Sequence, residues 1–154
     1  MNRSVTDDHL HELVSHTHAE GIEDLAAAAL IEHHGLLLLT ERVNPNFDTE
    51  PSSWELPTGP IKPGETLLTG LERVLSTHFA LELDQATHYL GHQDHPGPDG
   101  RLTRVFVFAA TVTNPDAICS TAHIGHRWID NIAISQTVPD INGLLRTYYA
   151  DNSV

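Results

Sequence analysis

The sequence is poor in cysteine, in basic residues and in long apolar runs. A single cysteine, Cys119, excludes an internal disulfide and fits a reducing compartment. Eight basic residues against 21 acidic ones give a net charge of −13, without the basic footprint of a nucleic-acid-binding or membrane-surface protein. No run approaches the roughly 20 apolar residues of a membrane span, and the N-terminal segment lacks an apolar stretch of signal-peptide length. We expect a cytoplasmic protein without nucleic-acid or membrane partners.

Histidine, by contrast, is abundant. The chain has 12 histidines, and protonating all of them would bring the net charge from −13 to −1. Because an unperturbed histidine titrates near pH ~6.5, solubility and self-association should depend on pH. Two interpretations stay open: most of these histidines are surface residues, or a few of them form a site.

The apolar pattern predicts one α+β domain with a mixed sheet. A chain of 154 residues can bury one sizeable core. Leucines at helical periodicity predict a helix over Thr66–Phe79, and β-branched and aromatic residues predict a strand over Leu102–Val112. The other predicted elements are a helix at 6–17, a glycine-turn hairpin at 26–32 and 36–42, a loop at 44–53, extended segments at 82–93 and 127–134, a turn at 96–100 and a helix at 139–149. This order indicates helices packed on a mixed sheet, with residues 1–24 as an N-terminal helical extension of a domain at 25–154.

A spaced set of residues follows the predicted loop. Gly59 is followed after five residues by Glu65, and Glu65 after seven residues by Arg73, with apolar residues at Leu75 and Leu81. This spacing resembles the box of the Nudix family.

Both flanks of the box support the resemblance. The segments Trp54-Glu55-Leu56-Pro57 and Pro63-Gly64-Glu65-Thr66 are similar to the family's common sequence, and so is the later segment 126–129. The resemblance covers roughly residues 25–150. It implies the Nudix fold, an α/β/α sandwich in which helices pack on the faces of a mixed sheet.

The box departs from the family pattern where the family binds magnesium. Val74, Thr77 and His78 stand in place of three glutamates, Ala80 in place of the box glycine, and Thr58 where glycine is usual. Glutamates at the first three positions would fall within an arc of about 100° on one helix. Magnesium needs such oxygen ligands, whereas valine offers none and histidine suits zinc or manganese better. The box has therefore lost its standard metal set.

The residues retained in the box suggest roles. The resemblance implies that Glu65 and Arg73 pair to hold the loop against the helix, and together with His78 they are our candidate catalytic residues. His78 stands at a former ligand position. If His126 or His123 approaches it, a histidine site for zinc or manganese rather than magnesium could form.

A second histidine group lies further along the chain. His92 and Asp94 share one strand face if their segment is extended, with His95 adjacent, and could supply a general base or another ligand. The alternative for every histidine group is a surface or hydrogen-bonded core role.

Candidate ligand-binding residues come from the few cations and from the flanks of the box. They are Arg42, Trp54, Glu55, Arg104 and His126. The strongly negative field would repel a nucleoside diphosphate in the absence of metal, unless local arginines outweigh the global charge.

Our first hypothesis is therefore a binding or repurposed domain for a nucleotide-like or other small ligand, with no resident cofactor. The alternative is an active hydrolase of a nucleoside-diphosphate-type substrate with a histidine-containing site for a divalent ion. A non-hydrolytic enzyme and an assembly role remain further alternatives. The last includes a homodimer formed through the N-terminal helix, because Nudix-like proteins are often homodimers.

Overall fold

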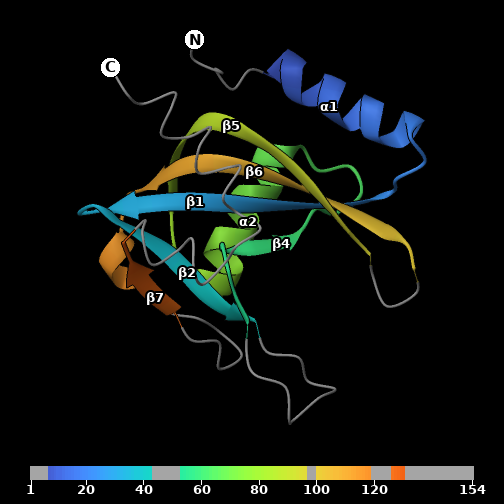
Figure 1. Cartoon of the computed structure of the whole chain (residues 1–154). Helices are drawn as coiled ribbons and strands as arrows, with labels where there is room; N and C mark the ends of the chain where they lie inside the picture. The colour runs from blue at the N-terminus through green and yellow to red at the C-terminus, as the bar shows by residue number, and fades with distance from the viewer. Residues whose placement is uncertain (1–6, 43–52, 97–99, 119–125, 131–154) are drawn as a thin grey trace, which may run out of the picture.

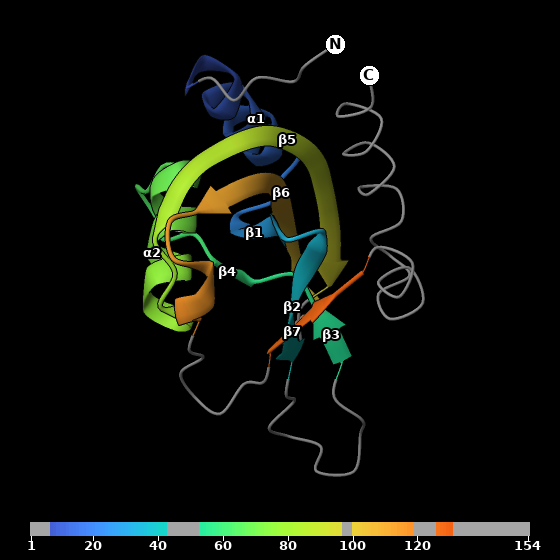
Figure 2. The ribbon, with the colours of Figure 1, turned by 90° about the vertical axis from the view of Figure 1, so that its left-hand side faces the viewer.

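The computed structural model describes residues 7–42, 53–96, 100–118 and 126–130, which form an α+β fold around a curved mixed sheet (Figures 1 and 2). The elements are α1 (Asp7–Ala19), β1 (Asp24–His33), β2 (Leu36–Arg42), β3 (Ser53–Glu55), β4 (Thr58–Pro60), α2 (Leu67–Phe79), β5 (Leu83–Pro96), β6 (Leu102–Val112), the 3-10 helix η1 (Pro115–Ala117) and β7 (His126–Ile129). The strand order is β3-β2-β1-β6-β5, with β4 beside β1 and β7 beside β2. The predicted fold class is confirmed.

Strand β1 organises the sheet. It runs parallel to β6 from the Asp24–Thr103 pair to the Ile31–Ala110 pair, and its first half also pairs with β4. Its side chains alternate between two buried clusters, so that Ile31 faces one cluster and Leu30 the other. A strand buried on both faces is expected to be continuously apolar, as β1 is over residues 25–31.

The turn between β1 and β2 confirms the predicted glycine hairpin. His34 and Gly35 have φ values of 54° and 78°, as a two-residue turn of type I′ requires. Next to this turn, β1 and β2 pair with each other only at Glu32–Leu37 and His33–Leu36. Further along, β2 pairs with β3 and β7 instead. The two halves of the hairpin therefore belong to different parts of the sheet.

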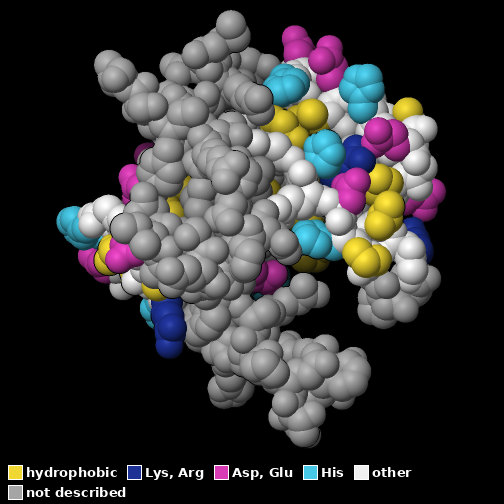
Figure 3. Space-filling view, in the orientation of Figure 1, with side chains coloured by type: hydrophobic (Ala, Val, Ile, Leu, Met, Phe, Trp, Pro, Cys, Tyr) yellow, Lys and Arg dark blue, Asp and Glu magenta, His cyan; other side chains and the backbone are white. Residues whose placement is uncertain are grey.

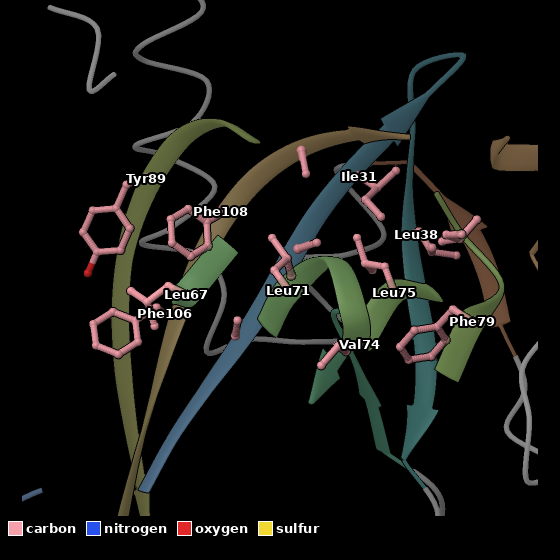
Figure 4. Packing of buried hydrophobic residues seen from close by; sticks show 14 of the residues in the cluster. Ile31, Leu38, Leu67, Leu71, Val74, Leu75, Phe79, Tyr89, Phe106 and Phe108 are labelled. Atoms are coloured by element: carbon pink, nitrogen blue, oxygen red, sulfur yellow. The ribbon is translucent and has the colours of Figure 1, made fainter. Parts of the chain in front are cut away.

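Helix α2 lies against β1 and β4 and supplies one wall of the larger buried cluster (Figure 4). The hydroxyl of Thr66 caps it by accepting the N–H of Thr69 at 3.1 Å. Its buried residues are Leu67, Gly70, Leu71, Val74, Leu75 and Phe79. Leu10 of α1 belongs to the same cluster, so α1 packs on this core as well.

Some elements differ from prediction. The strands β3 and β4, of three residues each, were not predicted because so short a run carries no measurable periodicity. Strand β5 continues to Pro96, past the predicted end at residue 93, and shifts register at three places along β6. The predicted helix at 139–149 lies outside the described residues. None of the helices that the structure describes is long and apolar enough to cross a membrane.

Candidate functional site

The loop between β4 and α2 is held to the helix by Glu65 and Arg73, as the resemblance implied. The Nε of Arg73 donates to Oε2 of Glu65 at 2.8 Å, and its Nη2 donates to Oε1 at 3.0 Å and to the carbonyl of Pro60 at 2.6 Å. The main-chain N–H of Lys62 donates to Oε1 at 2.7 Å. The Arg73 guanidinium and this N–H lower the pKa of Glu65 to about 2. This carboxylate remains ionised at neutral pH and holds the loop.

Val74 is a core residue. Its side chain is fully buried, and a Cβ added to Gly59 of β4 would lie only 2.7 Å from both of its methyl groups. Gly70 is equally confined, since an added Cβ would meet the side chain of Ile61 at 2.3 Å. The helix thus approaches β4 and the loop so closely that position 74 packs against apolar atoms.

The other two altered positions lie in different surroundings. Thr77 is exposed and His78 is half-buried, with the His78 ring 6.2 Å from that of Phe79. These three side chains do not fit magnesium, because one is apolar and buried, one is a neutral hydroxyl and one is an imidazole. Within the described ranges, no three histidine, cysteine, aspartate or glutamate side chains gather closely enough to hold a metal ion.

Ala80 ends α2 in the left-handed conformation that glycine normally adopts. Its φ is 57°, and the N–H of Leu81 donates back to the carbonyl of Leu75 at 2.9 Å. The amide of Asn114 fixes this end, because it accepts the N–H of Glu82 at 2.8 Å and donates to the Ala80 carbonyl at 3.2 Å. Ala80 therefore adopts the backbone conformation that a glycine would adopt at this helix end.

Arg104, a candidate binding residue, lies in a polar cluster that joins α1 to the sheet. Its Nε and Nη2 donate to both oxygens of Asp94 at 2.8 and 2.9 Å, and its Nη1 lies 2.5 Å from Glu20. Thr17, fully buried, is 3.4 Å from Nη1 and donates its own hydroxyl to the carbonyl of Leu13. We call Arg104, Asp94, Glu20 and Thr17 the Arg104 cluster. The guanidinium holds the pKa of Asp94 below its ordinary value, and the carboxylate holds that of Arg104 above its own.

In the second histidine group, Asp94 is engaged by Arg104, although His92 and His95 lie close enough to favour its ionised form. Both oxygens of Asp94 accept from Arg104, while His92 lies over Phe106 with a ring separation of 6.3 Å. Figure 3 shows histidine side chains in separate places on the face in view, interspersed with acidic ones.

Two further candidates lie in one row of the sheet, on opposite sides of β2. Thr40 of β2 pairs with Glu55 of β3 on one side and with His126 of β7 on the other, so these residues form one row across the sheet. Glu55 is half-buried and His126 is exposed. The side chains of Arg42 and Trp54 lie outside the described part of the chain, as does His123.

The sequence did not predict a cluster of side chains around His33, at the turn between β1 and β2. The Nε2 of His33 lies 3.7 Å from a carboxylate oxygen of Asp116, and its ring lies 3.9 Å from that of His34 and 5.7 Å from that of Trp128. The adjacent histidines are evident in the sequence, but no sequence pattern indicates that residues of η1 and β7 lie close to His33.

Comparison with solved structures shows the same fold in Nudix hydrolases. The solution structure of the ORF135 protein of E. coli has a TM-score of 0.66 and 21% identity, over 85% of this chain and 92% of that one. A NUDIX hydrolase from Nitrosomonas europaea has 0.66 and 20%, over 82% and 88%. The MutT protein of Methanosarcina mazei has 0.65 and 21%, over 84% and 96%. No family model and no curated protein matches the chain. The chain therefore has the Nudix fold.

Proposed function

We propose that this chain is a binding or repurposed domain of the Nudix fold, for a nucleotide-like or other small ligand, without the magnesium-dependent hydrolysis that its box would otherwise support. A fold shared at about 20% identity does not carry a reaction with it. The proposal therefore depends on the side chains of α2 and the loop.

One observation carries the proposal. Val74, at the position where the family pattern has a glutamate, is fully buried against Gly59, and its neighbours Thr77 and His78 supply no carboxylate. Catalysis by magnesium needs a bridging ion and a water that the ion activates. The two retained polar residues, Glu65 and Arg73, are engaged with each other and with the main chain of the loop.

The test is turnover of a panel of nucleoside diphosphate derivatives with magnesium, manganese, zinc or chelator. We expect no activity above the chelated control with any metal. Robust magnesium-dependent turnover that survives His78→Ala would overturn the proposal and assign the reaction to carboxylates outside the box.

His78→Ala separates the proposal from its alternative. His78 is half-buried in the last turn of α2, at a former ligand position, and an imidazole there is a ligand for zinc or manganese. Activity with either metal that His78→Ala abolishes, and that Ser76→Ala two residues earlier in α2 leaves intact, would establish a rebuilt metal site instead.

A further inference from the structure

The turn between β1 and β2 brings together three side chains of the types that bind metal ions. His33 ends β1 and His34 begins the turn, whereas Asp116 belongs to η1, which follows β6. Figure 1 shows η1 beside this turn. The Nε2 of His33 lies 3.7 Å from Oδ1 of Asp116. An imidazole and a carboxylate from distant parts of the chain therefore face each other.

The distance between these two atoms fits a shared ion better than a direct hydrogen bond. An N–H···O hydrogen bond spans roughly 2.7–3.2 Å, so a separation of 3.7 Å is too long for one. Two ligand atoms at about 2.0–2.2 Å from a tetrahedral zinc ion lie about 3.3–3.6 Å from each other. His33 and Asp116 need only a slight shift to hold the same ion.

The ring nitrogen of His33 also lacks a role within the fold. Its Nε2 is buried and has no hydrogen-bond partner among the residues that the structure describes. Buried polar atoms without a partner are uncommon in folded proteins, and a bound ion is one way to satisfy them. The side chain of Asp116 is 97% exposed, so its carboxylate can turn toward an ion without disturbing the core.

His34 supplies a third ligand after a rotation of its side chain. Its ring now lies against that of His33, with 3.9 Å between the ring centres, so these three side chains do not yet surround one point. His34 is exposed, and another staggered rotamer is open to it. Two imidazoles, one carboxylate and a water form a ligand set that suits zinc. The net charge of −13 favours a cation as well.

We propose that His33, His34 and Asp116 bind a zinc ion at the turn between β1 and β2. His33 binds through Nε2 as a neutral imidazole, with its proton on Nδ1. The ion links the end of β1 to η1, and it stabilises the folded chain because the unfolded chain does not hold these ligands together. The site is independent of the proposed function, since none of its ligands belongs to the box at 59–81.

The test is a zinc titration of the full chain, followed by the nitrogen chemical shifts of the histidine rings. We expect a saturable change at Nε2 of His33 and at the ring of His34. Asp116→Asn should weaken this binding at least about tenfold, because even a partner outside the metal's own ligands is worth about 10–100-fold in affinity. No saturable change at His33, or equal affinity in the Asp116→Asn variant, overturns the proposal.

Two matched substitutions in α1 control for the many other histidines and carboxylates. Asp8→Asn and His18→Gln each remove an exposed side chain of the same type from α1, and both should leave the zinc affinity measured at His33 unchanged. His34→Asn should lower the affinity, and asparagine tolerates the φ of 54° at this position. An equal loss of affinity in the α1 variants overturns the proposal, because zinc would then bind without preference for the turn.

His78→Ala and thermal denaturation separate this site from α2. His78→Ala should leave the zinc affinity at His33 unchanged, and a loss in this variant overturns the proposal in favour of a histidine site on α2. The midpoint of thermal unfolding should be higher with zinc than with chelator in the natural protein, and this difference should shrink in the Asp116→Asn variant. The presence or absence of turnover decides the proposed function and leaves the zinc affinity at His33 as measured.

Discussion

Val74 and Ala80 show, at the scale of single residues, how the side chains and backbone of α2 hold this helix in the fold. Val74 adds to the apolar contact between α2 and β4, and Ala80 keeps the left-handed backbone that ends the helix. Glu65 and Arg73 preserve the loop through hydrogen bonds that need no metal. The loop is thus held by Glu65 and Arg73, and position 74 contributes to the packing of the helix against β4.

Val74→Glu is expected to destabilise the protein rather than to create a magnesium ligand. A carboxylate at this fully buried position has apolar neighbours, so its ionised form should cost about 3 kcal/mol or more at pH 7. Burial raises the pKa of such a carboxyl, so the cost should grow as pH rises above about 4.3. Urea denaturation at pH 4.5 and pH 7 measures this loss of unfolding free energy.

Thr77→Glu is the control for that substitution. Position 77 is exposed, so the free energy of unfolding should change by no more than about 0.5 kcal/mol. Equal destabilisation by both substitutions would contradict the burial argument, and magnesium binding by the Val74→Glu variant would show that position 74 can still reach solvent.

Ala80→Gly is expected to stabilise the protein by about 1 kcal/mol. A side chain with φ of 57° costs roughly 1–2 kcal/mol, part of which glycine loses again through its freer unfolded chain. Chemical denaturation measures the gain. Ser76→Gly, at an exposed position inside α2, should instead destabilise by about 0.5–1 kcal/mol. A destabilising Ala80→Gly would mean that the methyl group has a packing role at the helix end.

At the scale of elements, α1 is attached to the sheet by the Arg104 cluster as well as by apolar contacts. Arg104 is buried, and it joins the last turn of α1 and the residue after it to β5 and β6. Leu10 reaches the main core from the first half of the same helix. Two distant points of attachment fix the helix along its length.

Arg104→Met is expected to lower the free energy of unfolding by about 3 kcal/mol at pH 7, because it leaves Asp94 without its partner. The stabilisation that Asp94 provides is complete above its ordinary pKa of 3.8 and is lost as pH falls through its lowered folded value. The difference between the variant and the natural protein should therefore shrink below pH 3.8. Urea denaturation from pH 7 down to pH 3 records both effects.

Arg101→Met is the control for Arg104→Met, because Arg101 also pairs with two carboxylates. The Arg101 side chain is 55% exposed, so the loss of its two ion pairs should cost less than about 1 kcal/mol. A similar cost for both arginine substitutions would contradict the importance of burial in the Arg104 cluster.

Long and periodic elements were predictable from sequence, and short or distant contacts were not. The helical periodicity of Thr66–Phe79 and the β-branched run of Leu102–Val112 came within one residue of α2 and β6. The spacing of Glu65 and Arg73 indicated their pairing through the family resemblance. The roles of Arg104 and His33 depend on segments far away in the chain, since Arg104 pairs with Glu20 and His33 lies close to Asp116. Local sequence patterns carry no information about contacts between residues so far apart in the chain.

At the scale of the whole molecule, 12 histidines in a chain of net charge −13 make charge strongly dependent on pH. Protonation of all 12 histidines would bring the net charge from −13 to −1 and so remove most of the net repulsion between molecules. Solubility, measured as the polyethylene glycol concentration that precipitates half of the protein, should therefore fall steadily between pH 8 and pH 5.5. A flat profile over this interval would mean that most of the histidines do not become protonated in the folded protein.

The parallel pairing of β1 with β6 affects when the sheet can form during synthesis of the protein on the ribosome. Each residue of β1 pairs with one about eighty positions later in the chain. Domains fold as units and contacts between distant segments form late, so β1 must wait for most of the chain to leave the exit tunnel. During that interval its run of alanine, leucine and isoleucine has no β6 to cover it, and a chaperone that shields nascent chains would find its binding site there.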